Sequence, residues 1–381
     1  MSRKIVQFGT SRFLQAHADL MLSEARDAGQ DVGEITIVET TGSPASRARV
    51  SAFADGKPFP VRIRGLENGV ARDETRWVGG VVAGLSARHD LEGLRAVFCD
   101  ADIVLSNTGD TGYSLPPNPK PALDDWTCFP ELLTALLRDR FERGGGPVTI
   151  LPCELISGNG DVLRRTVLDL AAMVLAEEPG EEPGQEAFVR WIEANCLFVN
   201  TLVDRIVSAP IDPIGAVAEP YALWAMEERP GFVPPCVHDQ IVVVPDLGPI
   251  ERKKLFILNL AHTLLAQRWL KTGGRDDMTV REAMADPEVR AWLDGIMTSD
   301  VVPAFPADDD APDYWRQCKE RFANPFLDHR LADIATNHTA KIERRVKGFL
   351  DWAGNQPGVP APEKLRAAFG EDQAKDRIEH S

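Results

Sequence analysis

The sequence predicts an α/β fold in which a doubly wound, mostly parallel sheet is followed by a mainly α-helical C-terminal domain. Short apolar, β-branched runs alternate with segments of helical periodicity in the first 247 residues, which is the pattern of parallel strands joined by crossover helices. From there to the C-terminus the periodicity is almost wholly helical. A chain of 381 residues favours two domains, and we expect them at residues 1–247 and 248–381.

The predicted strands share a short apolar run. They are residues 4–8, 34–40, 101–109, 148–154 and 240–246. A helix is expected over residues 13–28, and a long amphipathic helix follows Gly248 and Pro249. Residues 177–186, EEPGEEPGQE, are typical of a solvated connection between helices. Because ligands of doubly wound sheets bind beyond the carboxyl ends of the strands, the residues that follow the strands are candidates for a binding site.

Composition and charge exclude several classes of partner. With 58 acidic and 42 basic side chains the formal charge is −16, which repels nucleic acid and anionic membranes. An anionic substrate would need a local basic cluster. The six cysteines are scattered without CxxC pairs, so neither a zinc site nor a disulfide framework is expected. The sequence has no secretory signal and no transmembrane run, and we expect a cytoplasmic protein whose partner is a small molecule.

The first predicted strand runs into the turn GTSRF, where Gly9 supplies the tight turn that a dinucleotide-binding loop needs. Ser11 and Leu14 occupy the second and third glycine positions of a GxGxxG loop, so the match is incomplete. Serine is small enough for a pyrophosphate to approach the backbone, and amides at the start of the next helix attract an anion. The cofactor-binding candidates of this turn are therefore Gly9, Ser11, Arg12 and Phe13, with an ordinary strand-to-helix turn as the alternative.

Further cofactor contacts are predicted at the ends of the next strands. Glu39 ends the second strand, thirty residues after Gly9. A carboxylate there accepts hydrogen bonds from ribose hydroxyls and repels the extra phosphate of NADP, which favours NAD. A solvated glutamate is the alternative. Ser106, Asn107 and Thr108 end another strand and offer small polar groups to a ribose or nicotinamide.

The most informative segment is K-x4-N-x2-H, formed by Lys254, Asn259 and His262 in otherwise apolar sequence. At about 100° per residue, the three side chains fit one broad sector of an α-helix. Oxidation of an alcohol with NAD needs a base for the hydroxyl proton and a donor for the developing oxyanion. Lysine and asparagine can fill these roles, and burial beside a positive nicotinamide would favour the neutral amine. A solvated lysine, a core histidine and a bridging asparagine are the alternatives.

Seven stretches, in order between residue 5 and about residue 346, carry motifs of a known family. They are IVQFGTSRFLQAHAD, VLSNTGDTGY, ILPCELISGNGDVL, NTLVDRIV, EPYALWAM, ERKKLFILNLAHT and RFANPFLDHRLADIATNHTAKIERRV. Together they resemble the mannitol dehydrogenase family of polyol-specific long-chain dehydrogenases, and most of all its branch that reduces tagaturonate.

The resemblance implies a Rossmann-like N-terminal domain, a helical C-terminal domain, an active site in the cleft between them and no metal. It also implies that Lys254, Asn259 and His262 are the family's signature residues. Asn159 resembles the asparagine near the reacting carbonyl, and Asp204 resembles an acidic residue close to the cofactor. A structural pair of Asp204 with Arg205 is the alternative for the latter.

The expected substrate is an open-chain sugar acid, with D-altronate and D-tagaturonate as the redox pair. Its carboxylate needs a positive partner, and the late segment HRLADIATNHTAKIERR offers His329, Asn337 and Lys341, of which the last two share a helix face. A surface position for Lys341 is the alternative. Other candidates for the function are a fructuronate or mannonate oxidoreductase, a mannitol-type polyol dehydrogenase, and an NAD-binding regulatory protein without turnover.

Overall fold

The computed structural model describes residues 3–109, 112–177, 184–307 and 309–370. Contacts within the chain divide it into two compact units, one of residues 1–63 and 74–247 and one of residues 64–73 and 248–381. We call them the N-terminal and the C-terminal unit. The segment 64–73 therefore groups with the C-terminal unit although it comes early in the sequence. Residues 178–183 of the acidic connection expected at 177–186 lie outside the described residues.

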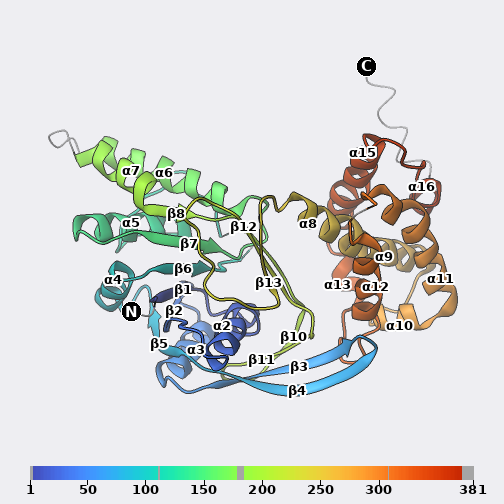
Figure 1. Cartoon of the computed structure of the whole chain (residues 1–381), viewed down its shortest axis with the longest axis horizontal. Coiled ribbons are helices and arrows are strands. Elements are labelled where there is room, and N and C mark those ends of the chain that lie inside the picture. The colour runs from blue at the N-terminus through green and yellow to red at the C-terminus, as the bar shows by residue number, and fades with distance from the viewer. Residues whose placement is uncertain (1–2, 110–111, 178–183, 308, 371–381) are drawn as a thin grey trace. The chain divides into compact units, whose positions relative to one another are not determined.

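The N-terminal unit is built on a six-stranded sheet in the order β5-β2-β1-β6-β7-β8, and every adjacent pair is parallel (Figure 1). The strands are β1 (Ile5–Phe8), β2 (Ile35–Glu39), β5 (Val81–Ser86), β6 (Ile103–Ser106), β7 (Val148–Pro152) and β8 (Cys196–Phe198). Numbered within this sheet, the order is 3-2-1-4-5-6, that of a Rossmann fold. The strand order reverses between β1 and β6, where such folds bind their ligands.

Helices and further strands cover the two faces of this sheet, which confirms the doubly wound prediction. Val6, Phe8 and Val104 point into one core with α4 (Leu91–Cys99), α5 (Phe129–Glu142), α6 (Asn159–Glu177) and α7 (Gly184–Asn195). Ile5 and Ile103 point into the other core, which includes residues of α2 (Ala18–Asp27), α3 (Pro44–Ala54) and the remaining strands. The helix expected over 13–28 is divided, because α1 (Arg12–Gln15) ends before α2 begins.

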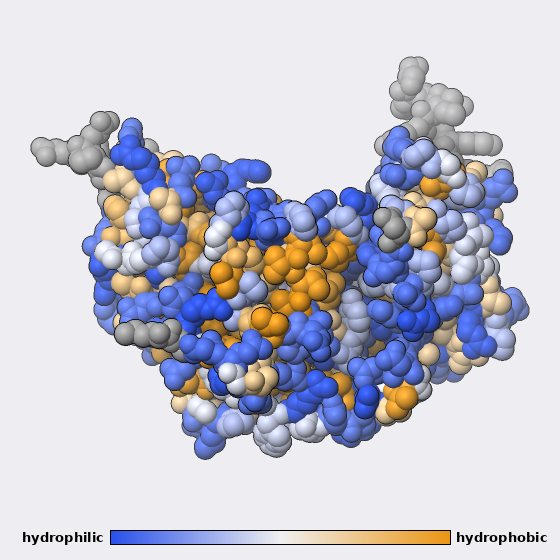
Figure 2. Space-filling model, viewed as in Figure 1, coloured by the Kyte–Doolittle hydropathy of each residue, from blue (hydrophilic) through white to orange (hydrophobic). Residues whose placement is uncertain are grey.

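Two smaller sheets complete the β structure. One has the order β10-β11-β3-β4 and consists of β3 (Phe59–Glu67), β4 (Val70–Val78), β10 (Val207–Pro210) and β11 (Ala216–Ala218). The other has the order β13-β12-β9 and consists of β9 (Thr201–Asp204), β12 (Leu223–Glu227) and β13 (Ile241–Val244). The strand expected at 240–246 therefore exists, but it lies outside the parallel sheet. Figure 2 shows apolar surface in the area where Figure 1 labels β12 and β13, and Val243 of β13 is exposed.

The C-terminal unit is helical from residue 248 onward in its described part, as expected (Figure 1). Its helices are α8 (Gly248–Lys253), η1 (Lys254–Asn259), α9 (Leu260–Thr272), α10 (Val280–Ala285), α11 (Pro287–Ile296), η2 (Met297–Val301), η3 (Val302–Ala304), α12 (Ala311–Phe322), α13 (Leu331–Ala335), α14 (His338–Lys341), η4 (Ile342–Lys347), α15 (Gly348–Gly354) and α16 (Glu363–Phe369). The elements η1, η2 and η4 are π-helical, and η3 is a 3₁₀-helix.

Contacts within the C-terminal unit hold Arg64 of segment 64–73 to the loop between α12 and α13. The amide of Asn324 donates to the main-chain oxygen of Arg64 at 3.3 Å, and the Arg64 guanidinium stacks 4.2 Å from the ring centroid of Phe326.

Among the described residues, no helix is both long and apolar enough to cross a membrane.

Candidate active site

The carboxyl ends of β1 and β6 bring two of the expected cofactor residues together. Gly9 has φ +113°, and a Cβ built on it would lie 2.6 Å from the main-chain oxygen of Asn107. Only glycine fits at such a φ and such a distance. The Asn107 amide side chain donates to the oxygen of Cys153 at 2.7 Å, which fixes the end of β6 against the end of β7. The turn is therefore closely packed at the place where the strand order reverses.

The other residues of the first turn form local structure. Ser11 caps α1 by accepting a hydrogen bond from the amide of Leu14 at 3.1 Å. Arg12 donates to the main-chain oxygens of Ile211 and Gly215 at 2.8 and 3.0 Å and pairs with an aspartate of the same β10–β11 turn. Phe13 stacks on a histidine ring at 4.8 Å. These side chains shape the turn, which leaves its backbone as the part suited to a pyrophosphate.

Glu39 is only 1% exposed at the end of β2. Its carboxylate accepts hydrogen bonds from the Ser86 hydroxyl at 2.5 Å and from the Gly42 amide at 2.7 Å. Each oxygen thus has one internal donor, and a carboxylate oxygen has a second lone pair for another. The ribose-binding role of Glu39 stays a prediction, and the structure adds that this carboxylate organises the β2–α3 turn.

Glu154 organises the end of β6, a role that the sequence reasoning missed. It is 3% exposed and accepts hydrogen bonds at 2.9–3.0 Å from the hydroxyls of Ser106, Thr108 and Tyr113 and from the main-chain amide of Thr108. Burial, together with the nearby Glu154 charge, raises the pKa of Tyr113 well above its usual range. The two expected cofactor residues Ser106 and Thr108 therefore turn their hydroxyls to Glu154. The glutamate that ends the strand predicted at 148–154 was the available signal.

Asn159 and Asp204 are both buried in the N-terminal unit. The Asn159 amide nitrogen lies 3.0–3.1 Å from the main-chain oxygens of Pro152, Glu154 and Thr201, and its oxygen accepts from the Thr201 amide at 2.8 Å. These contacts join β7 to β9 and use both amide protons, so they add no support to the predicted catalytic role.

The alternative role of Asp204 was a structural pair with its neighbour Arg205. The Arg205 guanidinium makes its three hydrogen bonds, at 2.6–3.0 Å, to the main-chain oxygens of Glu219 and Ala16. Burial lowers the pKa of Arg205 to about 10. Arg205 thus links β9 to the α1–α2 junction through the backbone, and a cofactor contact of Asp204 stays a prediction.

A dinucleotide fits what the N-terminal unit provides. The strand order reverses at Gly9, whose missing Cβ lets the first turn pack directly against the main-chain oxygen of Asn107. NAD, if bound there, would be held by the backbone of the first turn and by polar groups at the ends of β2 and β6.

Among the described residues, no group of three or more His, Cys, Asp or Glu side chains is placed to hold a metal ion.

The three signature residues lie in one uninterrupted helix made of α8, η1 and α9. Lys254 begins the π-helical turn η1 and Asn259 ends it. In a π-turn the hydrogen bonds run from i to i+5, so a residue lies nearly above the one five positions earlier. Asn259 is therefore closer to the side of Lys254 than the α-helical geometry of the sequence prediction placed it. Both side chains are half-buried.

His262 lies one turn further on and is 6% exposed. Its ring is 4.5 Å from the ring of Phe322 and 4.9 Å from the ring of His329, centroid to centroid. Its Nε2 atom has no hydrogen-bond partner among the described residues. Burial, with His329 and the charges of nearby cations, holds the pKa of His262 well below its usual range. The imidazole is therefore neutral at neutral pH, and its buried Nε2 atom is left without a hydrogen bond from the described residues.

The structure brings His329 and Lys341 toward this helix and leaves Asn337 apart. His329 contacts His262, and the Lys341 ammonium, whose charge acts on both histidines, donates to the oxygen of Ile334 at 2.7 Å. Burial and the Arg345 charge lower the pKa of Lys341. Asn337 is exposed and lies directly before α14. Its backbone has the left-handed conformation, with φ +54°. The helix face that it was expected to share with Lys341 therefore does not form.

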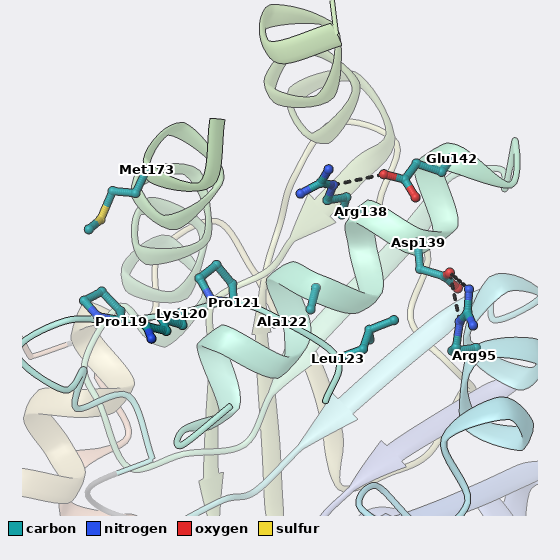
Figure 3. Close-up of a pocket in the computed structure, with 11 residues that line it drawn as sticks. Arg95, Pro119, Lys120, Pro121, Ala122, Leu123, Arg138, Asp139, Glu142 and Met173 are labelled. Carbon is teal, nitrogen blue, oxygen red and sulfur yellow. Dashed lines mark hydrogen bonds and ion pairs between the residues drawn. The ribbon is translucent and has the colours of Figure 1, made fainter. Parts of the chain in front are cut away.

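A pocket of about 500 Å³ in the N-terminal unit contains none of the predicted site residues (Figure 3). Its two arginines are neutralised, since Arg95 pairs with Asp139 at 2.5 Å and Arg138 pairs with Glu142 at 2.9 Å. Lys120 also lines this pocket.

Known relatives cover nearly the whole chain. Altronate oxidoreductase of Bacillus subtilis (strain 168) is 30% identical over 96% of this chain and 78% of its own length. Altronate oxidoreductase of Yersinia pestis bv. Antiqua is 30% identical over 94% of this chain and 77% of its own length. Altronate oxidoreductase of Escherichia coli O1:K1 is 29% identical over 96% and 78% of the two chains.

Solved structures of similar fold are polyol dehydrogenases. Mannitol 2-dehydrogenase of Pseudomonas fluorescens, in a ternary complex with NAD and D-mannitol, has a TM-score of 0.72 at 22% identity, over 91% of this chain and 75% of its own. A substrate-free D-sorbitol dehydrogenase has a TM-score of 0.73 at 23% identity, over 90% and 74%. These likenesses confirm the fold class.

Two family models match the chain. The mannitol dehydrogenase Rossmann domain matches residues 3–233, and the mannitol dehydrogenase C-terminal domain matches residues 246–353. The expected resemblance is thereby confirmed: the chain belongs to the mannitol dehydrogenase family and is, with its relatives, an oxidoreductase.

Proposed function

We propose that this chain is an NAD-dependent oxidoreductase that interconverts a secondary alcohol and a ketone on an open-chain sugar acid, with D-altronate and D-tagaturonate as the redox pair. The observation that carries the proposal is the placement of Lys254, Asn259 and His262 in one helix, where a π-turn brings the lysine and the asparagine toward one side. The names of the relatives, altronate oxidoreductases at about 30% identity over most of the chain, support the substrate.

Each signature residue has a role that its chemistry permits. NAD, when bound, supplies the hydride acceptor for alcohol oxidation. Lys254 takes the hydroxyl proton through Nζ, and the Asn259 amide donates to the oxygen that becomes the carbonyl. The neutral His262 bonds a further substrate hydroxyl through Nε2, the atom that has no partner among the described residues. In the reverse direction Lys254 returns the proton to the alkoxide. No step needs a metal ion.

The decisive experiment is a substrate panel followed by loss of NADH absorbance. D-tagaturonate, D-fructuronate, D-fructose and D-fructose 6-phosphate are compared at equal concentration, with NADH and with NADPH. We expect the highest kcat/KM for D-tagaturonate with NADH, unchanged by EDTA. A preference for fructose or for the sugar phosphate would reject the substrate. NADH binding without turnover on any substrate would identify a regulatory protein.

Lys254→Met tests the base, and Lys253→Met is its matched control. Loss of a general base costs about 10²- to 10⁴-fold in rate, so we expect kcat of Lys254→Met to fall by that factor with NADH affinity within a few-fold. Lys253 is next in sequence, but it pairs with Asp309 at 3.1 Å and with Asp310. We expect its variant to keep wild-type kcat. Near-normal turnover of Lys254→Met would contradict the assignment.

A further inference from the structure

A basic segment lies beside the signature helix in a protein of net charge −16. Residues 337–347 contain four basic side chains, Lys341, Arg344, Arg345 and Lys347, against the single acid Glu343. This acid pairs with Lys347 at 2.7 Å. Among the described residues no carboxylate pairs with the other three cations, so the segment has positive charge without compensation.

The nearest acid before this segment, Asp333, also has a partner. Asp333 accepts from the Nε and Nη2 atoms of Arg330, both at 3.0 Å, in a bidentate pair. Its charge acts on the neighbouring His329, but the Arg330 fork already holds both of its oxygens. Neither Asp333 nor Glu343 is therefore placed to neutralise Lys341 or Arg345.

Arg345 is held against the signature helix by one end of its guanidinium. Its Nη1 atom donates to the main-chain oxygen of Asn259 at 3.2 Å and to the hydroxyl of Thr263 at 3.1 Å. These two bonds use both protons of Nη1. The Nε–H and Nη2–H groups, which have no acceptor among the described residues, form the planar edge that matches a carboxylate. Burial and the Arg344 charge lower the pKa of Arg345 to about 10, so its cation is partly desolvated and is still charged at neutral pH.

Two cations of this segment, Lys341 and Arg345, lie close enough to the site to act on its buried histidine. Lys341, Arg345 and Arg321 all act electrostatically on the buried His262. The π-turn η4, which contains Arg345, packs against the π-turn η1, which contains Lys254 and Asn259. An anion at the Nε–Nη2 edge of Arg345 would therefore lie beside the helix that holds the proposed base.

We propose that Arg345 binds the carboxylate of the substrate through its Nε–Nη2 edge, with Lys341 as a supporting charge, and that this contact selects sugar acids over uncharged polyols. The proposal rests on the proposed function and names the residue that sets its substrate class. The Lys341 ammonium already donates one hydrogen bond to the oxygen of Ile334. It therefore supports the carboxylate mainly through its positive charge. Arg345 supplies the directional, two-bond contact.

The test compares a charged and a neutral ketose in three variants. Arg345→Met removes the guanidinium, Arg345→Gln keeps a neutral donor that can still reach the Asn259 oxygen, and Arg344→Met removes the exposed neighbouring charge as the matched control. For both Arg345 variants we expect KM for D-tagaturonate to rise about 10- to 100-fold, the effect of losing a charged hydrogen-bonded pair. We expect kcat/KM for D-fructose to change less than threefold, and Arg344→Met to resemble wild type.

Other outcomes overturn the proposal. Equal losses on both ketoses in a folded Arg345→Gln protein would mean that Arg345 only supports the helix. A loss on D-fructose 6-phosphate alone would mean that the anion is a phosphate. If the wild type turns over no substrate, the proposed function fails, and calorimetric titration with D-altronate still decides the binding role. Binding by wild type and Arg344→Met but not by Arg345→Gln supports it, and equal binding or none contradicts it.

Discussion

Replacement of the buried Asp19 by asparagine should remove a pH-dependent cost to stability. Asp19 is fully buried in α2, and the Gln7 side chain donates to its Oδ2 at 3.3 Å. Burial raises the pKa of Asp19 from 3.8 to about 7. Because the folded pKa is raised, the folded state keeps the proton that the unfolded state loses. Stability from this group is complete below pH 4 and is lost as the pH rises to about 7.

The size of the loss follows from the shift. At 1.36 kcal/mol per unit, a rise from 3.8 to about 7 corresponds to at most about 4 kcal/mol at pH 8. Asparagine has no proton to lose, and its amide would also give the Gln7 Oε1 atom a donor that the described residues do not provide. We expect Asp19→Asn to be more stable than wild type at pH 8, with the difference shrinking toward pH 5.

Urea unfolding across pH 5 to 8 measures this difference. Asp27→Asn, at the exposed end of the same helix, is the control and should differ from wild type by the same small amount at every pH. An Asp19→Asn curve parallel to that of wild type would show that the carboxyl titrates alike in both states. The reasoning from burial would then be wrong.

Three further substitutions test other contacts. Gly9→Ala would place a methyl group 2.6 Å from the Asn107 oxygen at φ +113°, so we expect at least about 2 kcal/mol of destabilisation and weaker NADH binding by fluorescence titration. Glu39→Gln weakens the bond from Ser86 and should cost about 1 to 2 kcal/mol, measured as a lower Tm. A higher NADPH-to-NADH ratio of kcat/KM in the same variant would indicate that Glu39 also faces the ribose, and an unchanged ratio would contradict it. Thr279→Ala removes the cap of α10 and should cost about 1 kcal/mol, whereas Thr279→Ser should cost little.

The sequence predicted the framework of the fold where local pattern decides it. The runs at 4–8, 34–40, 101–109 and 148–154 all became parallel strands, since a strand buried on both faces is a continuous apolar run. The run at 240–246 looks the same but joined a different sheet. Pairing depends on residues far away in sequence, so a short apolar run cannot specify its partner.

The sequence allowed candidate site residues to be chosen by their chemistry, but it did not show which residues they contact. Nothing local indicates that Ser106 and Thr108 bond Glu154, because that bond joins the ends of two strands about 46 residues apart. Arg345 was missed for another reason. In a charged run such as KIERR each cation is typical of solvated surface, and only the tertiary structure shows that Arg345 is drawn to the Asn259 oxygen.

The π-turn at Lys254–Asn259 makes the length of its helix part of the chemistry. A π-turn holds one residue more than an α-helical turn, so deleting one residue there would restore α-helical bonding and leave the later residues facing nearly the same way. His262 would then keep its place beside Phe322. Deleting one residue between Asn259 and His262, where the helix is α-helical, would instead turn His262 by roughly 100° and separate it from the proton acceptor.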